Sequence, residues 1–289
     1  DLPDLKGKVI IVTGGNAGIG FATVQHLARL GAKVYLAARN EGRATAAISR
    51  LQAEGLGPGN DFMKSESRLD VLGECPRLKT CSLSVDCTFP HHSHIGPFVF
   101  TRTLLPLLIQ TASQPGADVR IVNARSSSTS GGHIMIKDDI HFLTLDDLNK
   151  DFEDTFFPRI WIMTSNSTLA FPAYSKLANV LFTRELQKHV DAAGAPIIVT
   201  SVHPGFVGSE THIKFWESYH TGRFPRLVCT PPFEGAYNSV FAAVSPVVRS
   251  KPAEFKGAYL MPVGKIRSPV SPRRAIGWPK SYGIRQKGC

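Results

Sequence analysis

The sequence predicts an α/β protein with a doubly wound parallel sheet. Three features of its first part carry this prediction. The β-branched run at 8–13 is typical of a buried strand, a glycine-rich turn at 14–20 follows it, and apolar residues then recur at helical spacing up to Gly31. A second strand at 33–38 and a second helix at 42–54 come next. Strands that are separated by helices pair in parallel through right-handed crossovers.

The rest of the chain continues this alternation with one omission. The polar, glycine-rich stretch 55–68 is too short to hold a third strand and its crossover helix. We therefore expect a sheet that lacks one edge strand, so that the strand at 33–38 becomes the edge. Further strands are expected at 69–72, 119–123, 197–202 and 259–262, and further helices at 98–110 and 175–193. Residues 1–264 are expected to form one domain, and 265–289 a basic, poorly ordered tail.

Composition and charge point to a globular protein of a reducing compartment. Hydrophobic residues make up 43% of the 289 residues, and no apolar run reaches the length of a membrane span, so no integral membrane segment is expected. Five cysteines without disulfide spacing, behind a polar start in place of a signal peptide, predict a cytoplasmic protein. Much of the net charge of +10 lies at 265–289, where a solvated tail is favoured over a phosphate-binding surface, and no nucleic-acid partner is expected.

The turn at 13–20 reads TGGNAGIG and lies between a predicted strand and a predicted helix. Glycines at such a turn let a pyrophosphate approach main-chain N–H groups at the positive end of the helix. The strand before it, the helix after it and the second strand at the right distance favour a dinucleotide site over a simple strand-to-helix turn. The cofactor contacts expected in this turn are Gly14, Asn16, Gly18, Ile19 and Gly20.

The end of the second strand indicates which dinucleotide binds. A site for NAD places an acid there to accept a hydrogen bond from the ribose 2′-OH, whereas this chain has Ala38 followed by Arg39. A guanidinium suits a 2′-phosphate. The sequence therefore favours NADP(H) over NAD(H), with Arg39 as the discriminating residue.

Six segments together resemble the short-chain dehydrogenase/reductase family, most closely its retinol-dehydrogenase-like branch. They are TGGNAGIG (13–20), AAR (37–39), HIGPFVFTRTLLPLL (94–108), RIVNARSSS (120–128), YSKLANVLFTREL (174–186) and HPGFVGSET (203–211). The resemblance covers about 4–264, with gaps. It implies a single-domain Rossmann fold that moves a hydride between a nicotinamide and a carbonyl or alcohol; the substrate expected here is small and apolar.

The resemblance also implies the catalytic residues. In the family a tyrosine serves as acid/base, a lysine four residues later supports it and holds the ribose, a serine steadies the substrate oxygen, and an asparagine anchors a water. Carried onto this chain, these roles fall to Tyr174, to Lys176 and to Ser126, with Ser127 as the alternative serine. Ser93 stands at the position of the asparagine.

Two motifs of the family are disrupted. Lys176 follows Tyr174 by two residues instead of four, and residues two apart lie about 200° apart around a helix. The pair would therefore point to opposite sides of the helix, unless Tyr174 precedes the first helical turn. The family's Asn-Asn-Ala-Gly is absent after the strand at 69–72.

A Pro-Gly turn follows the strand at 197–202, as it does in the family, where it flanks the nicotinamide. The contacts that the resemblance implies here are Pro204, Gly205, Val207 and Ser209, the last at the place of a threonine that contacts the carboxamide. The helices at 97–110 and 175–193 match a dimer face of many relatives, so the resemblance allows a homodimer.

Two functional hypotheses remain open on the sequence: an NADP(H)-dependent oxidoreductase, and a catalytically inactive relative that still binds the nucleotide. The stretches 55–93 and 156–168 resemble errors in predicted exon boundaries, and a transcript that matches the chain throughout would refute this hypothesis. A rival zinc site is disfavoured because its spacing matches no tight zinc knuckle, and no metal is expected. Its candidate ligands are Cys75, Cys81, Cys87, His91, His92 and His94.

Overall fold

The computed structural model describes residues 2–56, 66–74, 94, 96–124, 170–210, 213 and 229–267. Their backbone forms one sheet of seven strands. The strands are β1 (Val9–Thr13), β2 (Lys33–Ala37), β3 (Val71–Glu74), β4 (Val119–Ala124), β5 (Ile197–Val202), β6 (Tyr259–Met261) and β7 (Lys265–Arg267). Their order in the sheet is β2-β1-β3-β4-β5-β6-β7, and every pair is parallel except the antiparallel pair β6–β7. The predicted doubly wound α/β fold is confirmed.

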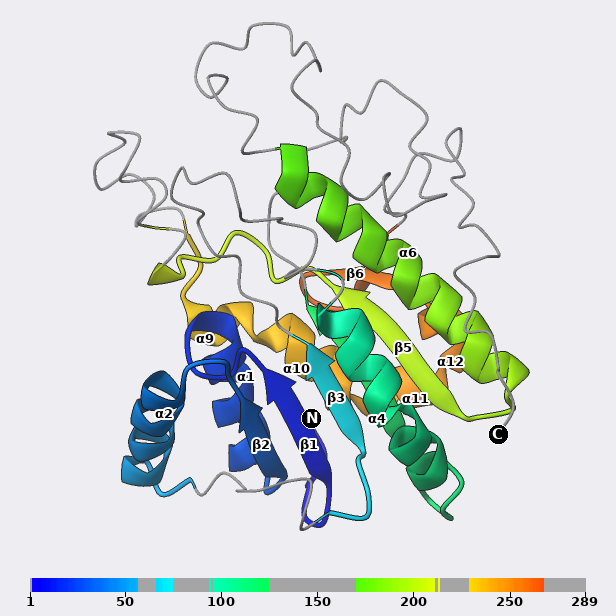
Figure 1. Ribbon diagram of the computed structural model, residues 1–289, viewed down its shortest axis with the longest axis horizontal. Coiled ribbons are helices and arrows are strands. Elements are labelled where there is room, and N and C mark those ends of the chain that lie inside the picture. The colour runs from blue at the N-terminus through cyan, green and yellow to red at the C-terminus, as the bar shows by residue number, and fades with distance from the viewer. Residues whose placement is uncertain are drawn as a thin grey trace, which may run out of the picture.

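Helices cover both faces of this sheet (Figure 1). They are α1 (Gly18–Arg29), α2 (Glu41–Ala53), α4 (Gly96–Ala112), α6 (Ala170–Ala192), α9 (Pro232–Gly235), α10 (Tyr237–Val244), α11 (Pro246–Ser250) and α12 (Pro252–Phe255). Helices α1, α2 and α10 pack on one face, and α4 and α6 lie side by side on the other (Figure 1).

The core is split into two layers by the alternation of side chains along each strand. In β1, Ile10 and Val12 are buried against α1 and α10, whereas Val9 and Ile11 are buried against α4 and α6. Because β1 is apolar on both faces, it reads as the continuous β-branched run that a buried parallel strand requires. This explains why the sequence pattern located it.

The sheet ends at β2 among the residues that the structure describes, since β1 is its partner on the inner side. This is the edge that the sequence predicts. Tyr35 of β2 donates a 2.5 Å hydrogen bond from its hydroxyl to Glu66, and the Lys33 ammonium lies 2.5 Å from the same carboxylate. The chain that enters β3 is thereby tied to the edge strand.

Several bounds differ from expectation, and three of these differences are the largest or bear on the site and the domain end. Helix α6 begins at Ala170, five residues before the predicted start. Strand β3 runs on to Glu74, past the predicted end at 72. Strand β7 adds residues 265–267 to the sheet, so the ordered backbone extends beyond the expected domain end at 264. The remaining tail residues, 268–289, and the stretch 156–168 lie outside the described residues.

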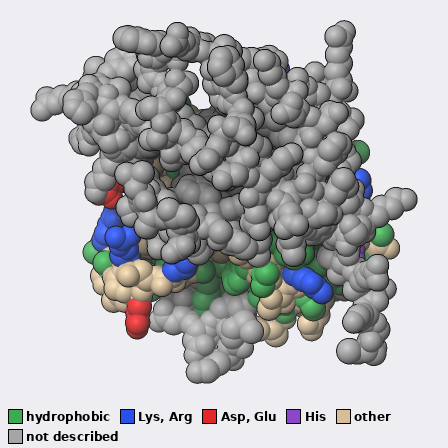
Figure 2. Space-filling view, turned by 45° about the horizontal axis from the view of Figure 1, so that its top comes forward, with side chains coloured by type: hydrophobic (Ala, Val, Ile, Leu, Met, Phe, Trp, Pro, Cys, Tyr) green, Lys and Arg blue, Asp and Glu red, His purple; other side chains and the backbone are tan. Residues whose placement is uncertain are grey.

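The surface of the described part is of mixed character. In the face shown in Figure 2, Lys and Arg side chains are dispersed between hydrophobic and other side chains, without forming one patch. None of the described helices is both long enough and apolar enough to span a membrane.

Candidate functional site

The turn between β1 and α1 is shaped by glycines at the positions where a side chain would not fit. Gly14 and Gly18 adopt positive φ, 64° and 56°, which glycine tolerates without steric cost. A Cβ atom on Gly20 would lie 2.4 Å from the Gly14 carbonyl oxygen, so the first turn of α1 rests directly on the loop. The Gly14 N–H donates a 2.8 Å hydrogen bond to the Ala37 carbonyl at the end of β2.

The N-terminus of α1 is suited to an anion. Its N-cap residue, Ala17, has no side chain that bonds the first-turn N–H groups, and the first turn contains no acidic residue. The first N–H groups of a helix lack partners within the helix, and the helix dipole places partial positive charge there. The main-chain N–H groups and the electric field of the helix dipole therefore both favour a phosphate at this turn.

Arg39 follows β2 on the same edge of the sheet and is exposed. The next residue, Asn40, is the N-cap of α2, and its side-chain oxygen accepts a 2.9 Å hydrogen bond from the Arg43 N–H. The backbone on both sides of Arg39 is thus held by regular structure, by β2 before it and by the cap of α2 after it. The exposed Arg39 lies two residues after Ala37, whose carbonyl accepts the hydrogen bond from the glycine turn.

The turn after β5 brings a distant part of the chain to the glycine turn. Gly205 has a φ of 88°, and its N–H donates a 2.8 Å hydrogen bond to the His203 imidazole Nδ1. Val207 is buried and forms a β-bridge with Thr230. The position of a Cβ on Gly18 lies 3.6 Å from the Ser209 Cβ. Two of the predicted cofactor segments therefore meet.

The predicted catalytic pair lies within α6. Because α6 begins at Ala170, Tyr174 does not precede its first turn, and that alternative is wrong. The Cα atoms of Tyr174 and Lys176 accordingly lie about 200° apart around the helix axis. Ser126 and Ser127 lie outside the described residues.

Two buried contacts identify the side of α6 that faces the carboxyl end of the sheet. Asn179 bonds the imidazole Nδ1 of His94, and the Thr183 hydroxyl accepts a 2.9 Å hydrogen bond from the Asn123 side chain on β4. At about 100° per residue, the Cα of Lys176 shares this side of the helix, and the Cα of Tyr174 lies on the opposite side. Of the two residues, the backbone of Lys176 therefore lies on the side of α6 that faces the sheet.

His94 is the only member of the rival zinc cluster that the structure describes. It is buried, and its ring lies 5.9 Å from the Phe182 ring and 6.5 Å from the Phe98 ring, centroid to centroid. The other candidate ligands, Cys75 to His92, lie outside the described residues. Within the described ranges, no three His, Cys, Asp or Glu side chains are grouped as a metal site would require.

Comparisons with known proteins agree with this geometry. Residues 8–72 match the family model described as short chain dehydrogenase. A short-chain dehydrogenase/reductase of Armillaria gallica is 37% identical over 92% of this chain and 87% of its own. The chain belongs to the short-chain dehydrogenase/reductase family. Human retinol dehydrogenase 14 is 30% identical over 88% of this chain and 79% of its own, in line with the predicted branch.

Solved structures share the fold of this family member. The RhlG/NADP active-site complex of Pseudomonas aeruginosa superposes with a TM-score of 0.63 at 19% identity, over 90% of this chain and 96% of that one. The likeness extends well beyond residues 8–72, which the family model matches.

This short-chain dehydrogenase/reductase carries a buried polar row that sequence reasoning missed. Glu74, Asn123 and Ser201 are the register partners at the carboxyl ends of β3, β4 and β5, and all three are buried. The Thr101 hydroxyl on α4 donates a 2.7 Å hydrogen bond to Glu74, the last residue of β3, after which the family's Asn-Asn-Ala-Gly is absent. The signal available in the sequence was a polar residue at the last or the last but one position of each of the three strands.

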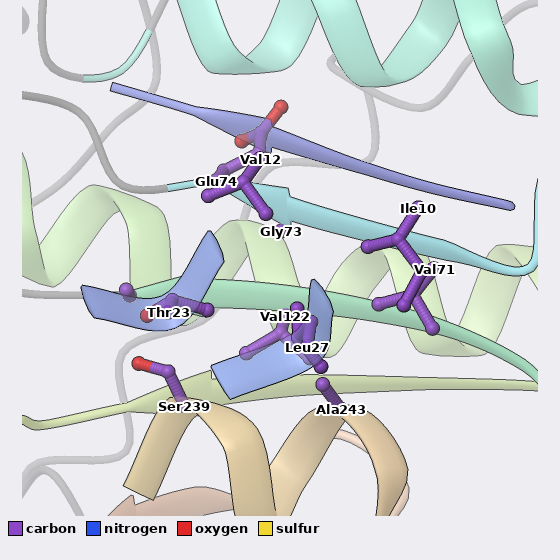
Figure 3. Close-up of a pocket in the computed structure, with 11 residues that line it drawn as sticks. Ile10, Val12, Thr23, Leu27, Val71, Gly73, Glu74, Val122, Ser239 and Ala243 are labelled. Atoms are coloured by element: carbon purple, nitrogen blue, oxygen red, sulfur yellow. The ribbon is translucent and has the colours of Figure 1, made fainter. Parts of the chain in front are cut away.

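A small cavity lies between the sheet and helices α1 and α10, on the face opposite α4 and α6 (Figure 3). Its volume is about 20 Å³, and Thr23 of α1 and Ser239 of α10 line it together with Gly73 of β3. A Cβ on Gly73 would lie 3.5 Å from the nearest atom, the Ile11 carbonyl oxygen, so the cavity marks a missing side chain.

Proposed function

We propose that the chain binds NADP(H) at the glycine turn and moves a hydride between it and a small apolar carbonyl or alcohol. The proximity of Gly18 to Ser209 carries this proposal, because it brings the phosphate end of the site next to the turn that flanks the nicotinamide in the family. The close approach of Gly20 to Gly14 supports it, since it seats the first turn of α1, whose N-cap offers no side-chain hydrogen bond, against the glycine turn.

Each half of the cofactor has its own set of residues. Backbone N–H groups of the turn from Gly14 to Gly20 would bind the pyrophosphate, and Arg39 would pair with the 2′-phosphate. Pro204, Gly205, Val207 and Ser209 would border the nicotinamide, and Lys176 would hold the ribose. The structure of RhlG is a complex with NADP, which supports NADP(H) for this chain as well.

The bound cofactor would supply or accept the hydride. The chain would supply the proton: Tyr174 would donate it to the carbonyl oxygen or take it from the alcohol, and Lys176 would be its electrostatic partner. Ser126 would donate a hydrogen bond to the same substrate oxygen. A small apolar substrate fits the aromatic residues near the loop after Pro204, which the sequence places at Phe215, Trp216, Tyr219 and Phe224.

A second candidate function is a catalytically inactive relative that still binds the nucleotide. One observation favours it: α6 begins at Ala170, so the helical backbone separates Tyr174 and Lys176 around its axis. A lysine ammonium favours the ionised form of a tyrosine only from a few ångströms away, so this separation would leave Tyr174 without the cation that supports its role as acid/base. The glycine turn is independent of this spacing.

NADPH titration followed by a turnover assay separates the candidates. Binding with turnover of an aldehyde or ketone panel supports the oxidoreductase, and binding without turnover supports the inactive relative. In the latter case, inserting two residues between Tyr174 and Lys176 should restore the family spacing and recover activity. Absence of NADPH binding would refute both candidates.

Assembly and location are further parts of the proposal. A homodimer would form through α4 and α6, where Val99 on α4 is an exposed apolar side chain. Light scattering of the purified protein checks it, and a monomeric mass at micromolar concentration would contradict it. The cysteine content favours the cytoplasm, which fractionation of a tagged chain tests.

A further inference from the structure

The buried amide of Asn238, at the start of α10, joins three separate pieces of backbone. Its nitrogen donates hydrogen bonds to the His203 carbonyl (2.7 Å) and to the Leu260 carbonyl (3.0 Å), and its oxygen accepts one from the Gly264 N–H (2.9 Å). Both donors and one acceptor site of the amide are thus used, and the side chain is 1% exposed. Polar groups satisfied in this way fix geometry, because each alternative leaves a buried group unpaired.

The three pieces of backbone surround the Pro-Gly turn. His203 ends the run from β5 into the turn, and its Nδ1 accepts the 2.8 Å hydrogen bond from the Gly205 N–H. On the other side, a Cβ on Gly205 would lie 3.2 Å from the Pro262 ring, which follows β6. Any shift of the end of β6 relative to the end of β5 would therefore move Gly205.

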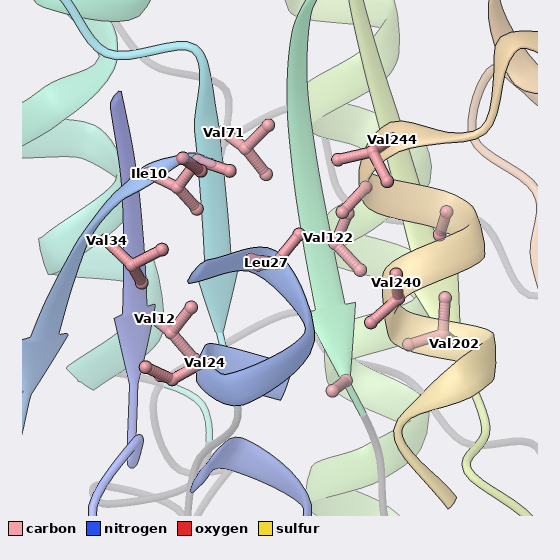
Figure 4. Packing of buried hydrophobic residues seen from close by; sticks show 14 of the residues in the cluster. Ile10, Val12, Val24, Leu27, Val34, Val71, Val122, Val202, Val240 and Val244 are labelled. Carbon is pink, nitrogen blue, oxygen red and sulfur yellow. The ribbon is translucent and has the colours of Figure 1, made fainter. Parts of the chain in front are cut away.

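Helix α10 gives this amide a rigid base. Val240 and Val244 of α10 lie opposite Val122 and Val202 of the sheet, in the same buried cluster (Figure 4). The Phe241 ring closes over Gly264, since a Cβ there would lie 2.6 Å from a ring carbon. The amide is consequently held in place by packing that does not depend on the turn.

We infer that Asn238 is a positioning residue for the nicotinamide half of the cofactor site: it holds the Pro204–Gly205 turn in the position that the nicotinamide ring requires. This inference rests on the proposed function. Asn238 touches neither the glycine turn nor Arg39, so its effect is confined to one half of the cofactor.

Two probes distinguish the halves. NADPH reaches both, whereas 2′,5′-adenosine bisphosphate reaches only the half that the glycine turn and Arg39 would bind. Asn238→Asp keeps the shape of the side chain and removes both donors. We expect it to raise the Kd for NADPH about tenfold and to leave the Kd for the bisphosphate within about twofold. Arg39→Ala should weaken both probes.

Control variants distinguish a specific effect on the nicotinamide half from a general loss of stability and from a failure of the proposed function. Val248→Ala, in the same core cluster but on α11, should lower the thermal midpoint without changing the ratio of the two Kd values. If Asn238→Asp does not fold, His203→Ala replaces it, because this variant removes the acceptor for the Gly205 N–H. We expect it, too, to raise the Kd for NADPH and to leave the Kd for the bisphosphate unchanged. Equal weakening of both probes, or unchanged NADPH binding in both variants, would overturn the inference. A wild-type chain that binds neither probe would instead refute the proposed function.

Discussion

Gly20→Ala adds one methyl group at the point where α1 rests on the glycine turn. The new Cβ would lie 2.4 Å from the Gly14 oxygen, below the 3.0 Å that real Cβ atoms observe, so helix and turn must separate by at least about 0.6 Å. Overpacking of this kind costs about 1–3 kcal/mol, and the better helix propensity of alanine offsets up to about 1 kcal/mol. The expected net loss of unfolding free energy is about 1–2 kcal/mol.

The matched control is Gly42→Ala in the first turn of α2. Its Cβ would meet no atom closer than the Asn40 side-chain oxygen at 3.7 Å, so only the propensity gain applies, about 0.5–1 kcal/mol. Differential scanning calorimetry should show midpoints that move in opposite directions, by about 2–4 °C per kcal/mol.

NADPH titration of the same two variants tests whether the packing at Gly20 is also needed for cofactor binding. Separating α1 from the turn at Gly20 displaces the main-chain donors of the proposed phosphate site, so the Kd should rise about tenfold or more, whereas Gly42→Ala should bind as the wild type does. A Gly20→Ala protein with wild-type stability and affinity would show that the turn tolerates the methyl group. It would refute the idea that the close packing of α1 on the glycine turn shapes the phosphate site.

Three further outcomes follow from the described side chains. Gly73→Ala should stabilise the fold by about 0.5–1 kcal/mol by filling the cavity of about 20 Å³ (Figure 3), and a lower urea midpoint would contradict this. Thr101→Val removes the hydroxyl that donates to buried Glu74 and should cost about 1–3 kcal/mol; the exposed control Thr103→Val should cost far less, and equal urea midpoints for the two variants would refute the role of the bond. Burial, above all, and the nearby positive charge of Arg29 lower the pKa of His26 below 6.5, against a hydrogen bond to the Phe233 carbonyl that raises it. The folded chain then binds the proton more weakly than the unfolded chain, so stability is full above about pH 6.5 and falls as the pH drops through that value. His26→Gln should flatten the pH dependence of the urea midpoint between about pH 7.5 and about 5.5, and an unchanged slope would exclude His26 as its source.

The sequence predicted those parts of the fold that depend on local order. Strand β1 and the first half of β5 are runs of apolar β-branched residues, and the glycine turn has its strand before it and its helix after it, so all three could be located from their own residues. Strand β3 was cut short at 72 because Gly73 and Glu74 are poor strand residues, and pairing with β1 and β4 overrides their propensity.

The start of α6 was missed for a different reason. The expected start at 175 leaves Pro172 outside the helix, yet proline is tolerated in a first helical turn, where its missing N–H would have had no partner. The short helices α9, α11 and α12 likewise begin at prolines that are equally compatible with loops.

The polar row and the Asn238 contacts depend on register between strands distant in sequence. No local pattern contains that register. Glu74 and Asn123 become neighbours only when β3 and β4 pair, and Asn238 finds His203 and Leu260 only after β5 and β6 align.

The proximity of Gly18 to Ser209 also means that the cofactor site is completed late in synthesis of the chain. The glycine turn leaves the ribosome early, and the segment that completes the site against it emerges only after β5 has been made. A nascent or truncated chain that ends before residue 209 would have the main-chain donors of the glycine turn but would lack part of the turn after β5, the second segment of the proposed cofactor site. Nucleotide added to such chains would gain little by mass action, whereas the finished chain would be stabilised in proportion to occupancy. The cofactor would therefore stabilise only chains in which the glycine turn and the turn after β5 have come together.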